Sequence, residues 1–467
     1  MATFGLIIGN RSFFPDHVVA SARRDLVATL AGWGHASVVL SEADTKGGGV
    51  ETISDARKCA ELFKVAPTLD GILVCMPNFG DELSIAEAIR RSGRAVPVLI
   101  QAVPDDPDRL DLANRRDSFC GKISLCNNLR QLGIPFTLTS KHVSRLDSAS
   151  FRDDVARFAA VCRIVSGLRT ARIGAIGARP DAFHTVRYSE KLLQKAGIDV
   201  AVVDLSMILH EARAWKDEAA IRAKIAEFEA YGTVEPGVPV ESVEKLARLT
   251  LALEAFVEEN GCTASAIQCW DSVQKDYGVA TCLPMSLMGM KGKPSACEMD
   301  VMGALSMRVL LDASGVPPML QDWNNNYADE PDKCINIHCS NYPACQFETK
   351  PDIGYLDILS TTLGRSACFG ACKGRVKAGP MTYLRVSTDD AAGRIRCYVG
   401  EGDFTDDPLD TFGGVSVCRV PDLEGLLRYL CAEGFEHHVA ITQGHVADAV
   451  EEALRTYLGW EVHRHGK

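Results

Sequence analysis

The sequence predicts an α/β protein in which two doubly wound parallel-sheet domains precede a mainly antiparallel β C-terminal domain. Three observations carry this prediction. Buried-strand patterns alternate with amphipathic helical patterns over residues 1–168, and a second alternation of this kind begins at Arg172. After about residue 345, two strand-like runs flank a turn sequence. We therefore place the domains at residues 1–168, 169–345 and 346–467.

Strands and helices alternate along the first domain, with strands expected at 4–9, 37–40, 71–76 and 96–101 and helices at 16–32, 54–65 and 82–92. The turn Gly9-Asn10-Arg11 lacks the Gly-x-Gly-x-x-Gly pattern, so it does not indicate a dinucleotide site. Arg11 follows the first strand at the edge where such sheets bind ligands, although a surface arginine is the commoner case.

The second domain repeats this alternation, with a strand at 172–177, a helix at 185–196, a strand at 199–205 and a long helix at 243–259. Further along, Glu298 and Asp322 stand 24 positions apart, with a helical pattern over 299–313 and a Ser-Gly-Val-Pro-Pro break between them. Two acids at strand ends over one cleft can share a divalent cation and stand on either side of a substrate carbon. The competing interpretation is a helix cap or a solvated loop residue.

The third domain contains two strand-like runs at 380–387 and 394–399. They flank Asp-Asp-Ala-Ala-Gly, which is typical of a hairpin turn. We therefore expect this part of the chain to be mainly antiparallel.

Composition and charge favour a globular protein that acts on small molecules. Hydrophobic residues make up 46% of the 467 residues, and the net charge is −11. The sequence contains neither a basic tail nor a basic helix, the features that would indicate binding to nucleic acid or to a membrane. The N-terminus enters a strand pattern without a basic leader or a long apolar segment, so we expect a cytoplasmic protein.

Most of the 17 cysteines lie singly in apolar contexts, where a reduced thiol packs as a small hydrophobe. One run is denser and contains Cys334, Cys339, Cys345, Cys368 and Cys372. It lacks the paired Cys-x-x-Cys spacing of a structural zinc site, so we expect unligated thiols there.

Three histidines lie in or beside strand-like runs, namely His338 and the pair His437-His438. Each one taken alone is explained as a satisfied core residue. Together with two carboxylates, however, one or two imidazoles form a ligand set that suits manganese, cobalt or magnesium.

Three separated segments resemble the L-fucose and L-arabinose isomerase family, and more closely its fucose isomerase branch. They are Ala296-Cys-Glu298-Met-Asp, Leu320-Gln-Asp322-Trp and His-His438-Val-Ala-Ile-Thr-Gln-Gly-His445, in the family's order. The resemblance implies that Glu298 and Asp322 are the catalytic acids and that His438 completes the metal site. His338 is similar to an additional metal ligand of the arabinose branch.

The substrate wall resembles the family less closely. His437 stands where the family has an asparagine, and Gln268 and Trp270 are only loosely similar to its polar and aromatic substrate contacts. The resemblance as a whole implies a ketol isomerase that uses Mn²⁺, or another divalent metal such as Co²⁺ or Mg²⁺, and a cis-enediol intermediate. It also implies a homo-oligomer, a hexamer or a related assembly, in which the first domain covers a neighbour's site. Independently of the resemblance, the first domain lacks a cofactor fingerprint of its own and carries Arg11 at the ligand-binding edge of its sheet, which a role in a neighbour's site would explain.

Two alternatives stay open from the sequence. One is an isomerase of an anionic sugar, sulfonated or acidic, such as sulfoquinovose, with Arg11 or Arg187 reading the anionic group. The other is a sugar-binding protein without catalytic activity, against which the intact acid pair and metal histidine argue.

Overall fold

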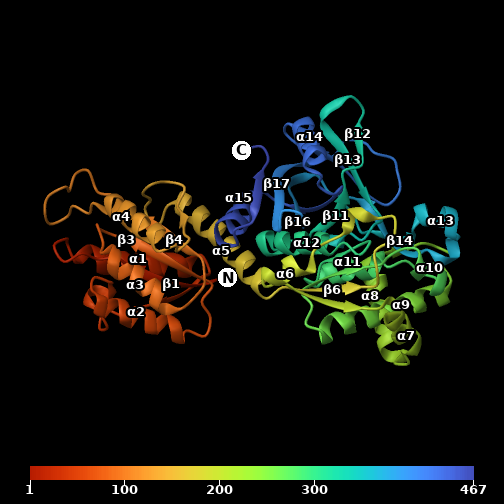
Figure 1. Ribbon diagram of the computed structural model, residues 1–467, viewed down its shortest axis with the longest axis horizontal. Helices are drawn as coiled ribbons and strands as arrows, with labels where there is room; N and C mark the ends of the chain where they lie inside the picture. The colour runs from red at the N-terminus through yellow and green to blue at the C-terminus, as the bar shows by residue number, and fades with distance from the viewer. The chain divides into compact units, whose positions relative to one another are not determined.

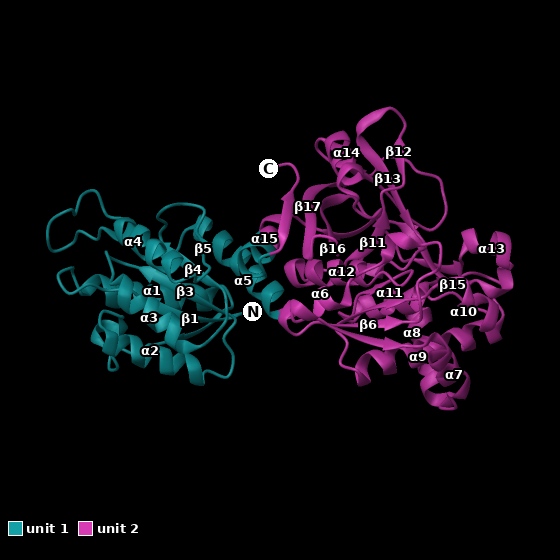
Figure 2. Cartoon of the chain, viewed as in Figure 1, with its two compact units in different colours: residues 1–166, 452–459 teal, residues 167–451, 460–467 magenta.

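The structure is a computed structural model that describes residues 1–467 (Figure 1). The chain divides into two compact units (Figure 2). Unit 1 contains residues 1–166 and 452–459, and unit 2 contains residues 167–451 and 460–467.

Unit 1 is built on a five-stranded, all-parallel sheet in the order β2-β1-β3-β4-β5. Its strands are β1 (Thr3–Ile8), β2 (Ala36–Val39), β3 (Gly71–Met76), β4 (Val98–Ala102) and β5 (Thr137–Leu138). Its helices are α1 (His17–Gly32), α2 (Ile53–Val65), α3 (Glu82–Ser92), α4 (Ser118–Gln131) and most of α5 (Ala149–Arg169). The predicted parallel sheet is confirmed.

Helices cover both faces of this sheet, which explains why its strands read as continuous apolar runs. In β3, Ile72 and Val74 belong to one buried cluster, whereas Leu73 and Cys75 belong to another. Successive side chains therefore enter the cores on opposite faces of the sheet.

Unit 2 contains a four-stranded parallel sheet in the order β10-β9-β6-β7. Its strands are β6 (Arg172–Ile176), β7 (Asp199–Val203), β9 (Ala264–Ile267) and β10 (Ser295–Ala296). The helices of this part are α6 (Glu190–Lys195), α7 (Leu205–Ala214), α8 (Glu218–Tyr231), α9 (Val240–Glu259), α10 (Ser272–Asp276), α11 (Cys282–Met290) and α12 (Val301–Ser314).

One helix starts later than the sequence predicts. We expected a helix over 185–196, but α6 begins at Glu190, because Ser189 caps it by accepting from the Leu192 N–H. The segment 178–188 between β6 and α6 is thereby left free of the helix, and this segment takes part in the site described below.

The second sheet of unit 2 is mixed and mostly antiparallel and has eleven strands. Eight of them follow the path β11-β19-β16-β17-β18-β15-β14-β8, and the other three pair beside it, β13 with β12 and β18 and β20 with β17. Its strands are β8 (Thr233–Val234), β11 (Met319–Asp322), β12 (Asn325–Tyr327), β13 (Glu330–His338), β14 (Asp352–Tyr355), β15 (Phe369–Arg375), β16 (Gly379–Asp389), β17 (Arg394–Thr405), β18 (Gly414–Arg419), β19 (His438–Gln443) and β20 (Glu461–Arg464). The helices that accompany it are α13 (Asp357–Leu363), α14 (Leu423–Glu433) and α15 (Ala447–Glu452).

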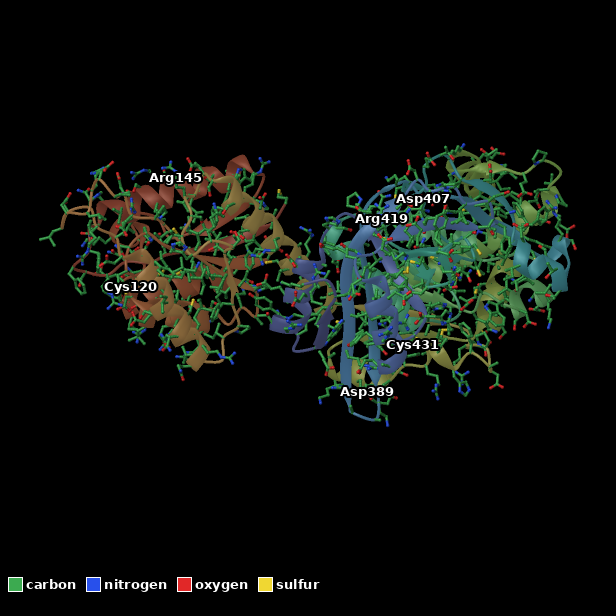
Figure 3. The ribbon with its side chains drawn as sticks, turned by 90° about the horizontal axis from the view of Figure 1, so that it is seen from above. Cys120, Arg145, Asp389, Asp407, Arg419 and Cys431 are labelled. Carbon is green, nitrogen blue, oxygen red and sulfur yellow. The ribbon has the colours of Figure 1, made fainter.

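The predicted hairpin is confirmed as β16 and β17, which pair in continuous antiparallel register from Gly379–Phe404 to Asp389–Arg394. Asp389 lies at the end of this long ribbon (Figure 3). The fold class is therefore as predicted.

The mixed sheet starts earlier than residue 346, since β11, β12 and β13 all belong to it. One hydrophobic cluster runs from Leu209 and Leu253 on the helices to Tyr383 and Ile441 on the mixed sheet. Helix α12 packs against β9 of the parallel sheet and against β16 and β19 of the mixed sheet. The division of residues 169–467 into two domains stays a prediction.

None of the helices combines the length and the apolar character that crossing a bilayer requires. Cys120 and Cys431 are exposed, and both are labelled in Figure 3. The remaining cysteines are buried or partly buried, as expected for thiols that pack as small hydrophobes.

Candidate active site

The pairing of β11 with β19 brings two of the predicted site residues together. These strands are antiparallel, and Asp322, the last residue of β11, stands opposite His438, the first residue of β19. Directly opposed residues direct their side chains to the same face of a sheet. Asp322 Oδ1 lies 3.5 Å from His438 Nε2.

Glu298 reaches the same point from the short connection between β10 and α12. Glu298 and Met299 both adopt left-handed backbone conformations, with φ of 62° and 60°. Such a conformation costs a non-glycine residue roughly 1–3 kcal/mol and persists where the surroundings impose it. Trp270 Nε1 donates to Glu298 Oε1 at 3.0 Å, and Glu298 Oε2 lies 3.1 Å from His438 Nε2.

Three buried atoms at this point have no hydrogen-bond partner: Glu298 Oε2, Asp322 Oδ1 and His438 Nε2. Buried polar atoms are normally satisfied, and buried charges are paired or coordinate metals. Two carboxylate oxygens and one imidazole nitrogen form a donor set that suits Mn²⁺, Co²⁺ or Mg²⁺. The residues present therefore fit a divalent cation.

The other two histidines lie beside this group. His338, buried at the end of β13, places Nε2 3.7 Å from Asp322 Oδ1. His437, which is exposed, places Nε2 4.0 Å from the same oxygen. Two groups of three residues bring their ligand atoms close together. Within each group these atoms all lie within 4.8 Å of one another, and the groups are Glu298, His338 and His438, and Asp322, His437 and His438.

Asp300 is a member of the site that the sequence reasoning did not assign. Its Oδ2 lies 2.8 Å from His438 Nδ1, and Arg385 Nη2 donates to its Oδ1 at 3.1 Å. Asp300 also caps α12 by accepting from the Gly303 N–H at 2.8 Å. Asp300 and Arg385 are completely buried. The sequence does contain a pattern that could have indicated Asp300, since a second acid follows Glu298 two positions later, just before a predicted helix.

Electrostatics concentrate positive charge at the imidazole. Burial raises the pKa of Glu298, but the adjacent imidazoles of His438 and His338 outweigh burial and lower that pKa to about 2. Burial lowers the pKa of His438, but Asp300 and Glu298 outweigh it and raise that pKa to about 10. The carboxylates around His438 thus require a cationic group among them, which a proton or a metal ion can provide.

Two family models match this chain. The fucose/sulfoquinovose isomerase N-terminal domain matches residues 5–169, and the L-fucose isomerase C-terminal domain matches residues 336–465. The chain belongs to the fucose isomerase-like family. The second match contains His338, His437 and His438, and the first contains Arg11.

Two curated relatives match more than three quarters of this chain. It is 26% identical over 408 residues to the sulfoquinovose isomerase of Alkalicoccus urumqiensis, a match that spans 85% of this chain and 87% of the relative. It is 26% identical over 373 residues to the sulfoquinovose isomerase of Priestia aryabhattai, which covers 77% and 78% of the two chains. The sulfoquinovose isomerase of Clostridium sp. (strain MSTE9) is 26% identical over 298 residues, 62% and 64% of the two chains. The protein is an aldose–ketose isomerase.

The side chains predicted to contact substrate lie in two different units of the isomerase. Gln268 follows β9, where its Oε1 accepts from the Ala178 N–H at 2.9 Å and its Nε2 donates to Ser272 Oγ at 3.0 Å. Both ends of this amide are therefore engaged in holding loops. Arg11 belongs to unit 1, where its Nε donates to Gly80 O at 2.9 Å and its guanidinium pairs with Glu82.

An aromatic side chain that the sequence did not indicate packs over the histidines. The ring of Phe183 lies 5.5 Å from that of His437, 5.9 Å from that of His438 and 5.9 Å from that of Trp270, between centroids. Phe183 belongs to the segment 178–188 that precedes α6. This segment therefore forms part of the wall of the candidate site.

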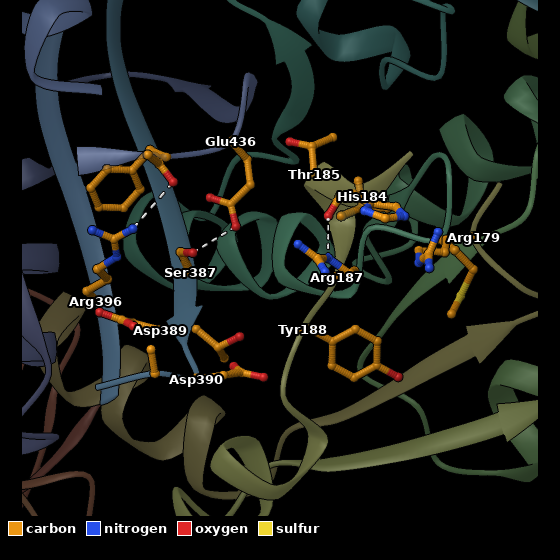
Figure 4. Close-up of a pocket in the computed structure, with 16 residues that line it drawn as sticks. Arg179, His184, Thr185, Arg187, Tyr188, Ser387, Asp389, Asp390, Arg396 and Glu436 are labelled. Carbon is orange, nitrogen blue, oxygen red and sulfur yellow. Dashed lines mark hydrogen bonds between the residues drawn. The ribbon is translucent and has the colours of Figure 1, made fainter. Parts of the chain in front are cut away.

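Cavities adjoin the acid and histidine cluster. One of about 320 Å³ is lined by Asp322 and His338, together with residues that include Tyr355 and Lys373. Another, of about 710 Å³, is lined by Met299, which follows Glu298, and by much of the segment 178–188 (Figure 4). Both volumes have the size of small-molecule sites.

Proposed function

We propose that this isomerase converts a sulfonated aldose such as sulfoquinovose into the corresponding ketose, using a divalent metal ion and a cis-enediol intermediate. The single observation that carries the metal-dependent part is the convergence of three unpartnered buried atoms, Glu298 Oε2, Asp322 Oδ1 and His438 Nε2. The sulfonated substrate is supported by three relatives, each named sulfoquinovose isomerase.

Glu298, Asp322 and His438 would hold the metal ion, with His338 as an additional ligand and Mn²⁺ as the first choice of ion. When bound, a divalent cation stabilises the negative charge that develops on the sugar oxygens and keeps both carboxylates ionised against their mutual repulsion.

The chain's own residues move the proton. Glu298 and Asp322 exchange a proton between C1 and C2 of the open-chain sugar, as paired carboxylates on either side of a carbon are able to do. Trp270 holds Glu298 by donating to Oε1, which leaves Oε2 directed at His438. Asp300 holds the imidazole of His438 from its Nδ1 side. The side chains of His437 and Trp270 bind the substrate in this proposal, whereas Gln268, whose amide is engaged with Ala178 and Ser272, holds the loops beside the substrate.

A second candidate is a neutral aldose, which the likeness to the L-fucose isomerase C-terminal domain favours. The same acids and the same metal ion would serve both substrates, since C1 and C2 are chemically alike in the two sugars. The difference lies at the far end of the sugar, where a sulfonate requires cationic partners.

One experiment tests the proposal in two stages. Purified protein is analysed for bound metal, stripped with a chelator and reloaded with Mn²⁺, Co²⁺ or Mg²⁺. Ketose formation is then measured with sulfoquinovose, glucose and L-fucose. We expect metal-dependent turnover, with the highest kcat/KM for sulfoquinovose. Full activity of the stripped protein would disprove the metal-dependent part, and a preference for L-fucose would favour the second candidate.

A further inference from the structure

The cavity of about 710 Å³ has a cationic wall. Arg179, His184 and Arg187 all come from the segment 178–188 and line this cavity. Figure 4 shows them on one side of it, with Asp389, Asp390 and Arg396 on the other. The cavity is thus bounded by the segment after β6 and by the turn between β16 and β17.

Both arginines of this wall retain free hydrogen-bond donors. Arg187 Nε donates to His184 O at 3.0 Å. Arg179 Nη1 donates to Pro180 O at 2.9 Å and to Asp181 O at 2.7 Å. These partners are neutral carbonyl oxygens that fix the position of each guanidinium without neutralising its charge. A guanidinium held in this way presents its remaining N–H groups to an oxyanion in a planar fork.

Of the three acids on the opposite wall, Glu436 and Asp389 have partners, and Asp390 lies on the turn between β16 and β17. Glu436 Oε2 lies 3.3 Å from Arg385 Nε, and its Oε1 accepts from Ser387 Oγ at 2.7 Å. Asp389 Oδ2 lies 3.3 Å from Arg394 Nε, and its Oδ1 accepts from the Ala392 N–H at 3.0 Å. The charges of Glu436 and Asp389 are therefore balanced locally, and they do not cancel those of Arg179 and Arg187.

The same segment connects this wall to the acid and histidine cluster. Phe183 lies between Arg179 and Arg187 in sequence, and its ring packs on His437, His438 and Trp270. From the other direction, Met299 lines the cavity and directly follows Glu298. Phe183 and Met299 therefore connect the cationic wall of the cavity to the acid and histidine cluster.

We propose that Arg179 and Arg187 form the subsite that binds the sulfonate of the substrate and so select sulfonated over neutral sugars. The inference rests on the proposed function, and it assigns specificity to two residues that lie outside the acid and histidine cluster. Sulfoquinovose and glucose differ at C6, where one carries a sulfonate and the other a hydroxyl, so the pair isolates the contribution of this subsite.

The test compares Arg179→Gln, Arg187→Gln and the double variant with the wild type on sulfoquinovose and on glucose. Arg222→Gln is the matched control, because Arg222 is an exposed arginine of α8 outside the cavity. We expect KM for sulfoquinovose to rise by about tenfold or more in each single variant, because each loses a charge-assisted hydrogen bond to the substrate. Turnover of glucose, bound metal and thermal unfolding should be unchanged, and Arg187→Lys should restore part of the loss.

Two outcomes would overturn the inference. One is an equal loss with both sugars, which would indicate a general structural role. The other is an unchanged KM for sulfoquinovose in the double variant. If the wild type isomerises no aldose, the proposed function fails separately. The subsite is then tested by calorimetric titration of sulfoquinovose into the wild type and the double variant, and equal affinity, including no binding to either, would reject it.

Discussion

His438 Nδ1 lies 2.8 Å from Asp300 Oδ2, and Arg385 holds the other oxygen of the same carboxylate. All three side chains are buried. An acid hydrogen-bonded to one nitrogen of an imidazole fixes the orientation of the ring and raises the basicity of the other nitrogen. In this protein the other nitrogen is Nε2, which faces Glu298 and Asp322.

Asp300→Asn should weaken metal binding while leaving the helix cap in place. Asparagine keeps the shape and can still accept from the Gly303 N–H, but it loses the charge that supports His438. We expect metal affinity to fall by about 10–100-fold, measured by competition with a chromophoric chelator. Turnover at saturating Mn²⁺ should largely recover. Unchanged affinity would mean that Asp300 serves only the buried pair with Arg385, and thermal unfolding with and without metal separates the two roles.

Glu298→Gln should remove isomerisation while retaining the fold. Glutamine keeps the side chain's size and an oxygen that can accept from Trp270 Nε1, but it supplies no carboxylate for proton transfer. Loss of such a group lowers kcat by about 10²–10⁴-fold. Ketose formation and exchange of the substrate C2 proton with solvent are measured together, and both should be lost. Turnover like that of the wild type would rule out Glu298 as a catalytic acid.

His438→Ala should reduce metal affinity more than His437→Ala does. His438 is buried and faces both acids, whereas His437 is exposed and lies 4.0 Å from Asp322 Oδ1. We expect excess Mn²⁺ to restore part of the activity of His438→Ala, because one of few ligands is lost. His445→Ala is the control, since His445 Nε2 lies 3.3 Å from Gly402 O. If His437→Ala or His445→Ala lost metal and His438→Ala did not, the assignment of His438 would be wrong.

The prediction about assembly concerns Arg11. If the first domain of one subunit completes a neighbour's site, Arg11→Ala should lower activity while the content of bound metal stays unchanged. Mixed oligomers provide the sharper test. Oligomers refolded from a mixture of Arg11→Ala and Glu298→Gln subunits should be more active than either variant alone, since some sites then contain both native residues. A fully active monomer in light scattering under assay conditions would refute the shared site.

Much of the fold follows from local sequence patterns. The apolar run Gly71–Met76 reads as a strand buried on both faces, and the structure confirms it as β3. The hairpin of β16 and β17 follows from alternating residues around a turn. The helix between Glu298 and Asp322 follows from its apolar residues. It ends at Ser314 and is followed by Gly315, whose φ of 72° suits glycine, ahead of the predicted Pro-Pro break.

The site depends on contacts that no local pattern encodes. The sequence and its resemblance named Glu298, Asp322 and His438, but only the β11–β19 register brings Asp322 opposite His438 across more than 100 positions of chain. Asp300 reads locally as a helix cap, and its contact with His438 exists because α12 is packed against β19. Phe183 precedes the predicted helix and carries no local signal of a role, and only the tertiary structure places its ring on the histidines. Local free energies decide strands, helices and turns, whereas the packing of distant elements decides which side chains meet.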